Sequence, residues 1–227
     1  EKLAALGTLA AGLAHEIRNP LNAAHLQLAL LQRRLQKTLA PDVSGALQAA
    51  ALVSGEMRRL AALVEEFLQF AKPQPLHRVH IDLRACAESV CALSAPEAAH
   101  LGVDLVLEPG PKVKVWADDE KIRQVLHNLV RNALEASEAG KQVVLTISAT
   151  EKQALLCVKD EGYGLPSDRG RIFEPFFTTK ASGTGLGLAI VHRIVTDHGG
   201  DVHVESMPGQ TIFRVVLPRG NKDLSRR

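Results

Sequence analysis

The sequence predicts an α+β protein in which a helical hairpin precedes a two-layer α/β sandwich. Apolar residues recur at heptad spacing in two runs before residue 72, a pattern typical of helices that pack side by side. The stretch "KPQP" at 72–75 then ends the helical pattern. Beyond it, short alternating runs interchange with longer amphipathic segments, which indicates strands mixed with helices. We therefore expect one domain over 1–72 and a second over 77–220.

The first apolar run crosses a proline. Apolar or small residues recur at steps of three and four from Leu3 to Ile17, and the run resumes at Leu21. The two parts are out of phase by one residue at Pro20, where a helix loses a backbone donor and bends. We therefore expect a kinked first helix.

The second apolar run extends from Ala50 to Ala71 and predicts another helix. The two helices would form an antiparallel hairpin. Because one hairpin cannot cover both faces of its own apolar seam, we expect two copies of the chain to form a dimeric four-helix bundle.

The elements of the second domain follow from apolar period and turn residues. Strands are expected at 79–83, 103–108, 112–117, 142–150, 154–162, 201–206 and 211–217, and helices at 84–102, 119–140 and 186–200. A glycine-rich segment separates two of these elements, between residues 162 and 187. This order of strands and helices favours a sheet with helices on one face.

Composition excludes some classes of function. The chain has 27 Lys and Arg against 25 Asp and Glu, a formal charge of +2, which argues against nucleic acid as the main partner. Its three cysteines form no CxxC pattern, which indicates reduced thiols in a cytoplasmic protein. The sequence opens within a predicted helix and has no membrane span or leader. We expect a fragment of a longer protein, in which an upstream sensor module and a membrane anchor are compatible with the sequence.

A polar cluster lies just before the kink of the first helix. Since Leu13 and Ile17 occupy the seam, His15 faces outward beside Glu16, and Asn19 lies one turn further on. An exposed histidine next to a carboxylate is suited to act as a nucleophile that accepts phosphate. The same side chains also suit an ordinary solvated helix face, so this stretch alone leaves both interpretations open.

Two glycine-rich stretches of the second domain are suited to approach phosphate. Asp160, Gly162 and Gly164 follow a strand, and "GTGLGL" at 183–188 leads into a helix. Backbone amides and a helix N-terminus both favour anions there. Neither stretch is a Walker loop or a dinucleotide fingerprint, and each alone also suits a flexible turn.

Other polar and aromatic residues point to the same region. Asn128 and Asn132 lie four apart on one helix face, a spacing that suits a hydrated magnesium ion between phosphates; Glu135 is a weaker candidate on that face. Phe176 and Phe177 precede Lys180 in "EPFFTTK" and are typical of a mobile lid with its cation near a terminal phosphate. The alternative for Asn128 and Asn132 is an asparagine pair without a function, because such pairs are common on helices. The alternative for the Phe176–Lys180 stretch is an ordinary anchored loop.

In their order along the chain, these motifs resemble the catalytic core of sensor histidine kinases of two-component systems. "HEIRNPLN" resembles the phosphoacceptor box, and "NLVRNALEA", "DEGYGLP", "FEPFFTTK" and "GTGLGLAI" resemble the N, G1, F and G2 boxes. The resemblance covers nearly the whole chain, and "PFFTTK" is most similar to the nitrogen-regulation-like branch. Glu161 departs from the family, in which asparagine is commoner, and this leaves the lid entrance open to question.

The resemblance implies a reaction and a set of contacts. ATP would phosphorylate His15 while Glu16 accepts the ring proton, and the group would pass to an Asp of a response regulator. Glu16 followed three residues later by Asn19 also implies phosphatase activity toward that regulator. Asn132 and Asn128 would hold Mg²⁺. The expected ATP-binding residues are Asn128, Asn132, Asp160, Gly162, Gly164, Phe176, Lys180, Gly183, Thr184, Gly185, Leu186 and Gly187.

Two rival functions stay open. One is a nucleotide-binding dimeric signalling scaffold that transfers no phosphate, against which the presence of all these residues argues. The other is an ATPase of the chaperone or mismatch-repair kind, which would lack the histidine box.

Overall fold

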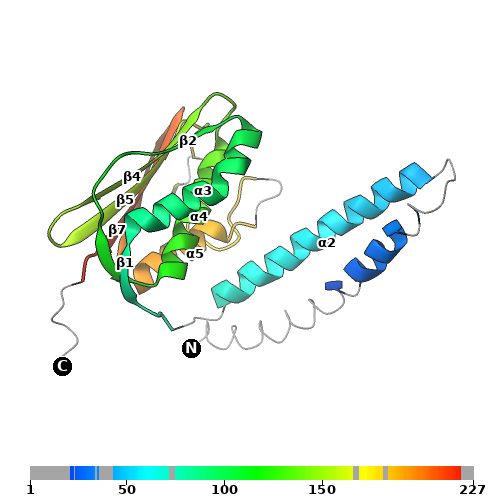
Figure 1. The fold of residues 1–227 in the computed structure, drawn as a ribbon, viewed down its shortest axis with the longest axis horizontal. Coiled ribbons are helices and arrows are strands. Elements are labelled where there is room, and N and C mark those ends of the chain that lie inside the picture. Colours follow the sequence, from blue (N-terminus) through cyan, green and yellow to red (C-terminus); the bar gives the residue numbers. More distant parts are fainter. Residues whose placement is uncertain are drawn as a thin grey trace. The chain divides into compact units, whose positions relative to one another are not determined.

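The computed structural model describes residues 21–22, 24–33, 35, 43–71, 75–165, 169–180 and 184–220. The chain divides into two compact units, Glu1–Gln74 and Pro75–Arg227 (Figure 1). The division falls inside the proline-containing segment at 72–77.

The first unit is helical in its described part. Residues 24–33 are helical, and α2 runs for 29 residues, Val43–Ala71. Ala50 of the expected seam is 4% exposed, whereas Val53 is 49% and Leu26 is 59% exposed within a single chain. Large apolar side chains left exposed along helices are typical of a surface that another chain covers. The dimeric bundle itself stays a prediction. No described helix is both long and apolar enough to cross a bilayer.

The second unit combines a five-stranded sheet, a separate two-stranded sheet and three helices. The larger sheet has the order β2-β4-β5-β7-β6; β2 and β4 are parallel and every other pair is antiparallel. β1 and β3 pair antiparallel by themselves. The elements are β1 (Val79–Asp82), α3 (Leu83–Leu101), β2 (Asp104–Leu107), β3 (Lys114–Ala117), α4 (Asp119–Ala136), β4 (Gln142–Ala149), β5 (Gln153–Asp160), a 3₁₀ turn (Arg169–Arg171), α5 (Gly187–Asp197), β6 (Asp201–Met207) and β7 (Gln210–Pro218).

The helices α3, α4 and α5 cover one face of the larger sheet (Figure 1). Side chains alternate along β5, and the helix-facing ones, including Leu156 and Val158, are at most 3% exposed. Those on the other face are only partly covered. The predicted α+β class and its two-layer second domain are therefore confirmed.

Helix α4 lies at the centre of the helical layer and carries the two asparagines. Asp118 caps its start by accepting from the backbone N of Lys121 at 3.2 Å. The helix ends at Ala136, four residues before the predicted end at 140. Ser137 is extended, and its hydroxyl donates to the carbonyl of Ala133 at 2.8 Å, an alternative to helical backbone pairing.

Other predicted ends also differ from the structure. The strand expected to reach 162 stops at Asp160. The other strand and helix ends agree with the prediction or differ by at most three residues, and the turn Arg169–Arg171 was not predicted. Boundaries of this kind depend on hydrogen bonds made across the fold rather than on apolar period.

A buried histidine joins α5 to α4. His198 is 4% exposed, and its Nε2 accepts from the backbone N of Asp118 at 3.0 Å. Its Nδ1 lies 2.7 Å from the carbonyl of Ile194, which it therefore donates to. Burial lowers the pKa of His198 and keeps the ring neutral. The contact fixes the C-terminal end of α5 at the start of α4, so that the first residue of α5 reaches Asn128.

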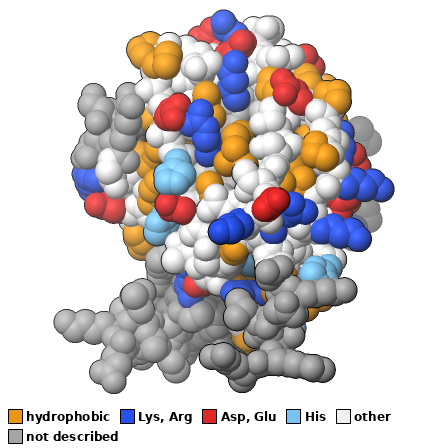
Figure 2. Space-filling model, turned by 90° about the vertical axis from the view of Figure 1, so that its left-hand side faces the viewer, with side chains coloured by type: hydrophobic (Ala, Val, Ile, Leu, Met, Phe, Trp, Pro, Cys, Tyr) orange, Lys and Arg blue, Asp and Glu red, His pale blue; other side chains and the backbone are white. Residues whose placement is uncertain are grey.

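Among the described residues, the larger sheet ends in two edge strands, β2 and β6, each paired on one side only. β2 is only four residues long and carries the exposed Asp104. Along β6 the exposed positions Asp201, His203 and Glu205 alternate with more buried ones, and Glu205 pairs with Arg214 of β7. The face of the molecule shown in Figure 2 likewise mixes charged side chains of both signs with apolar ones, as is ordinary for a solvated surface.

Candidate nucleotide-binding site

Asp160 is a buried carboxylate at the end of β5. It is 3% exposed and lies on the helix-facing side of the sheet. Its Oδ1 accepts from the backbone N of Gly162 at 2.9 Å. Burial raises the pKa of Asp160, and the Gly162 amide and the charge of Lys180 act in the opposite direction. A buried acceptor with one oxygen used locally is suited to receive an amino group of a ligand.

The glycines after Asp160 are required by close approach. A Cβ on Gly162 would lie 2.5 Å from the carbonyl oxygen of Ala136, at the end of α4. Gly164 has φ +86°, and a Cβ there would lie 2.9 Å from the carbonyl oxygen of Met207. The chain after β5 is therefore packed against both α4 and β6, and neither position can carry a side chain without a shift of backbone.

Two polar residues beside Asp160 were missed from the sequence. Thr211 of β7 is the direct cross-strand neighbour of Asp160, and Ser206 of β6 is the neighbour of Thr211. The Thr211 and Ser206 hydroxyls are 3.1 Å apart, and Ser206 Oγ accepts from the backbone N of Leu165 at 2.8 Å. The sequence does contain a signal that Thr211 is buried. It falls in phase with three buried apolar residues of its strand, Phe213, Val215 and Leu217.

The two asparagines of α4 have different neighbours. Asn128 is 9% exposed, and its Nδ2 donates to the carbonyl of Gly187 at 3.4 Å. Asn132 lies one turn further along, where its Oδ1 accepts from Lys180 Nζ at 3.4 Å. Asn128 thus contacts the first residue of α5, while Asn132 faces the glycine-rich segment. Their amide oxygens are ligands of the type that Mg²⁺ accepts, together with water and phosphate.

Phe176 is held through its backbone. It has φ +66°, which is unusual for a side-chain-bearing residue, and its backbone N donates to the carbonyl of Gly185 at 3.0 Å. Its ring is 57% exposed. Phe177 instead lies under the guanidinium of Arg171, 4.8 Å from the ring centroid, and Arg171 pairs with Glu174 at 2.9 Å. The aromatic pair therefore does not act as one buried anchor.

The segment 184–187 leads into α5. Gly185 has φ +69°, and a Cβ on it would lie 2.4 Å from the carbonyl carbon of Phe176. Leu186 is fully buried, and its backbone N donates to Thr184 Oγ1 at 3.3 Å. Among the residues that the structure describes, no side chain caps the N-terminus of α5, which begins at Gly187. Such an end presents backbone amides to an anion.

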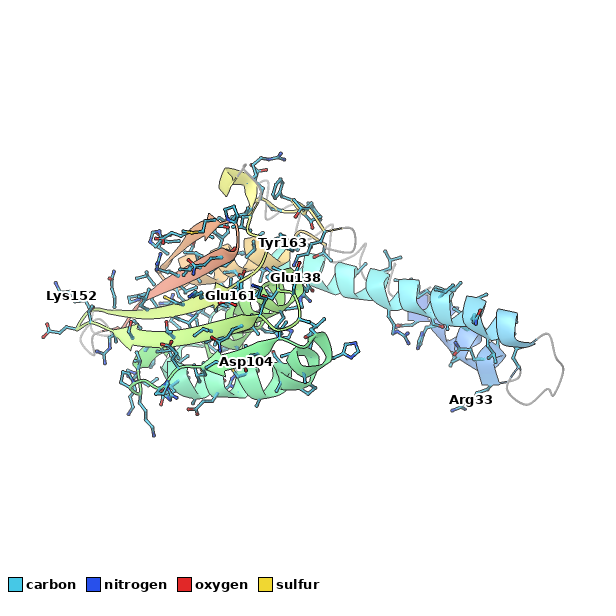
Figure 3. The ribbon with its side chains drawn as sticks, turned by 90° about the horizontal axis from the view of Figure 1, so that it is seen from above. Arg33, Asp104, Glu138, Lys152, Glu161 and Tyr163 are labelled. Atoms are coloured by element: carbon cyan, nitrogen blue, oxygen red, sulfur yellow. The ribbon has the colours of Figure 1, made fainter. Side chains whose placement is uncertain are left out.

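Lys180 and Glu161 complete the described surroundings. Lys180 pairs with Glu135 of α4 in addition to Asn132. Glu161 is exposed, and its Oε2 accepts from the backbone N of Gln142 at 3.3 Å. Figure 3 labels Glu161, which directly follows β5, and Tyr163, which lies two residues further along the same segment. Glu161 thus contacts the start of β4.

The structure brings most of the expected ATP-binding residues into one neighbourhood. Asp160, Gly162 and Gly164 lie at the strand ends beside α4, and Asn128, Asn132 and Lys180 connect α4 with the segment before α5. The glycine cradle and the amide oxygens fit a nucleotide with its magnesium ion. Gly183 lies outside the described residues, as do His15, Glu16 and Asn19 of the first unit.

Two known families match the chain, one over its first part and one over its second. Residues 5–76 match the "His Kinase A (phospho-acceptor) domain". Residues 117–221 match the "Histidine kinase-, DNA gyrase B-, and HSP90-like ATPase" family. The phosphoacceptor match separates the chain from the chaperone-like ATPases that share the second domain.

Individual relatives are similar over almost the whole chain. The chain is 34% identical to the signal transduction histidine-protein kinase AtoS of Escherichia coli (strain K12) over 98% of its own length and 37% of that protein's. It is 39% identical to the sensor histidine kinase ZraS of the same strain, over 96% and 46%. The chain thus spans less than half the length of these curated relatives. Neither is named for nitrogen regulation, and the assignment to that branch stays a prediction.

Solved structures extend the likeness to three dimensions. Full-length ShkA in complex with AMPPNP matches with a TM-score of 0.78 and 31% identity, over 94% of this chain and 46% of that one. The catalytic domain of histidine kinase ThkA matches with a TM-score of 0.59 and 32% identity, over 63% and 96%. ThkA in complex with the response regulator protein TrrA matches with a TM-score of 0.70 and 29% identity, over 97% and 64%. The chain belongs to the protein histidine kinases, with a phosphoacceptor domain followed by their ATP-binding domain.

Proposed function

We propose that the chain binds ATP with Mg²⁺ at the site around Asp160 and transfers the γ-phosphoryl group to His15. The observation that carries this is the convergence of a buried acceptor, a glycine cradle and the start of α5 at one site. Asp160 would accept from the adenine amino group, and the amides at Gly185 to Gly187 would contact phosphates. Magnesium, held by Asn132 with Asn128 as its helper, would neutralise phosphate charge.

The transfer needs a nucleophile and a base from the first unit. His15 Nε2 would form a bond to the γ-phosphorus as the bond from that phosphorus to the β–γ bridging oxygen breaks, releasing ADP. Glu16 would take the ring proton from His15. The phosphoryl group would then pass to a carboxylate of a response regulator. One solved relative, ThkA, is in complex with a response regulator protein, which supports a partner of this class.

The decisive experiment is incubation with γ-labelled ATP and magnesium. Label that is lost in acid and kept in base identifies phosphohistidine. His15→Ala should abolish labelling and leave nucleotide affinity unchanged, because nucleophile and nucleotide site belong to different units. Nucleotide binding without any label in the unsubstituted chain would favour the signalling scaffold, and equal label in His15→Ala would assign the acceptor elsewhere.

We also infer regulator phosphatase activity from Glu16 and Asn19. An amide is no base at neutral pH, but it can orient a water molecule. Asn19→Ala should spare autophosphorylation and slow regulator dephosphorylation by about 10²–10³, the cost of roughly 2–4 kcal/mol for one orienting group. Glu16→Ala should affect autophosphorylation most. The assay is decay of phosphorylated regulator with ADP present; equal decay in Asn19→Ala would leave that residue a role only in the helix bend.

The assembly and location of the protein are inferred from the first unit. We infer that residues 1–71 form a homodimer, since Leu26, Leu52 and Leu60 are exposed in one chain. A monomer in light scattering at micromolar concentration would contradict this. We infer a cytoplasmic core joined upstream to a sensor module, with a membrane anchor compatible with this arrangement. Assignment to the nitrogen-regulation-like branch rests on "PFFTTK".

A further inference from the structure

Glu135 is a carboxylate with two cationic neighbours. Its Oε1 lies 3.7 Å from Arg131 Nε, one turn earlier on α4. Its Oε2 pairs with Lys180, which comes from the glycine-rich segment 45 residues away in the sequence. The first contact lies within a helix, whereas the second joins α4 to a segment with no regular structure.

Lys180 also reaches Asn132. Its Nζ lies 3.4 Å from Asn132 Oδ1, the oxygen that the proposed function assigns to magnesium. The charge of Lys180 is felt at Asp160, where it lowers the carboxyl pKa against the larger effect of burial. A positive charge therefore already lies among the polar groups of the site.

We propose that Glu135 is a positioning residue that holds the Lys180 ammonium on Asn132 until a divalent cation displaces it. The inference rests on the proposed function, because that function gives Asn132 to the metal. An ammonium and a divalent cation repel each other at hydrogen-bond distances and therefore compete for one amide oxygen. Lys180 then moves toward the phosphates that arrive with the metal.

The residues around Glu135 favour this replacement of Lys180 by a divalent cation. Arg131 stays beside Glu135 on the same helix, so the carboxylate keeps a cation when Lys180 leaves. Lys180 is 29% and Glu135 39% exposed, which places the pair among the weak, solvent-screened ion pairs. By thermodynamic linkage, the ion pair that holds Lys180 on Asn132 weakens metal binding. Metal binding in turn weakens the attachment of the segment that carries Lys180.

The test is the Mg²⁺ concentration that gives half-maximal binding of a fluorescent ATP analogue. Glu135→Gln weakens the hold on Lys180 and should lower this concentration about two- to fivefold, the range set by an ion pair of this exposure. If Glu135 were itself a metal ligand, the same substitution would raise the concentration. Glu138→Gln makes the same charge change three residues later, on an exposed residue, and should leave the concentration unchanged.

A second readout needs no nucleotide. Amide hydrogen exchange over residues 176–187 should become faster in Glu135→Gln and in Lys180→Met, and the double variant should be no faster than either single one. A raised or unchanged Mg²⁺ requirement in Glu135→Gln, or additive exchange in the double variant, overturns the proposal. If the unsubstituted chain bound no ATP, the proposed function would fail, while exchange would still decide whether Glu135 holds Lys180.

Discussion

Replacing Gly185 with alanine should disable nucleotide binding while leaving the sheet domain folded. Gly185 has φ +69°, a conformation that costs an L-residue about 1–2 kcal/mol. Its new Cβ would lie 2.4 Å from the carbonyl carbon of Phe176. That atom is backbone and cannot turn aside, so the two chain segments must separate. Separation breaks the bond from the Phe176 amide to the Gly185 carbonyl, worth about 1 kcal/mol.

These contributions oppose the observed loop arrangement by about 2–3 kcal/mol. Only molecules with the loop in place can bind, so the apparent affinity falls with their fraction. At about 1.4 kcal/mol per tenfold change, ATP affinity should fall about 30- to 140-fold. The thermal unfolding temperature should change little, because separation of the two loop segments relieves the strain without unfolding the helices and strands that form the core, whereas Gly209 lies in the short turn that joins β6 to β7.

The assay is isothermal titration with ATP and Mg²⁺, with unfolding followed in parallel. Gly209→Ala is the matched control, since Gly209 has φ +85° but no described atom within 4 Å of the point where a Cβ would lie. It carries the same backbone cost without the collision and should lose stability by about 1–2 kcal/mol at unchanged affinity. Binding by Gly185→Ala within threefold of the unsubstituted chain would refute the reasoning.

Three further predictions concern buried titratable groups. Burial raises the pKa of Asp160, so the folded state holds that proton more tightly and stability falls as pH rises through the raised pKa. The Asp160→Asn variant should therefore unfold at a higher temperature than the unsubstituted chain at pH 7, yet bind ATP more weakly. Its stability advantage should shrink toward pH 4. Burial lowers the pKa of His198, so stability should decline as pH falls below about 6.5, and His198→Gln should flatten that decline in urea titrations; an equally steep decline would contradict the assignment. Burial, with a contribution from Asp119, raises the pKa of Cys86 to about 12, so a thiol reagent at pH 8 should label it only on unfolding.

The sequence predicts the helices and strands well where the burial of each residue follows the apolar period of its own element. The inward phase of β5 ends at Asp160, and the motif order identifies the glycines beside it. The helix end at Ala136 was placed too late, because the competing bond of Ser137 is a matter of side-chain geometry rather than of period.

Contacts between distant segments are what the sequence could not supply. Lys180 meets Asn132 across 48 residues, and Thr211 meets Asp160 only because β7 inserts beside β5. The sequence suggests Phe176 and Phe177 only as part of a lid or an anchored loop, and it is the backbone amide of Phe176 that makes the contact with Gly185. Such pairings depend on strand order and loop path, which apolar spacing does not determine.

The edge strands of the larger sheet affect whether copies of this chain associate edge to edge at high concentration. An unpaired edge is a template for another strand. Here β2 offers only four residues, and a strand added to β6 would lie beside the exposed row of Asp201, His203 and Glu205, which its own side chains would partly dehydrate. Dehydrating those groups is costly. If two chains associate as proposed, their ATP-binding domains would therefore have little tendency to join edge to edge.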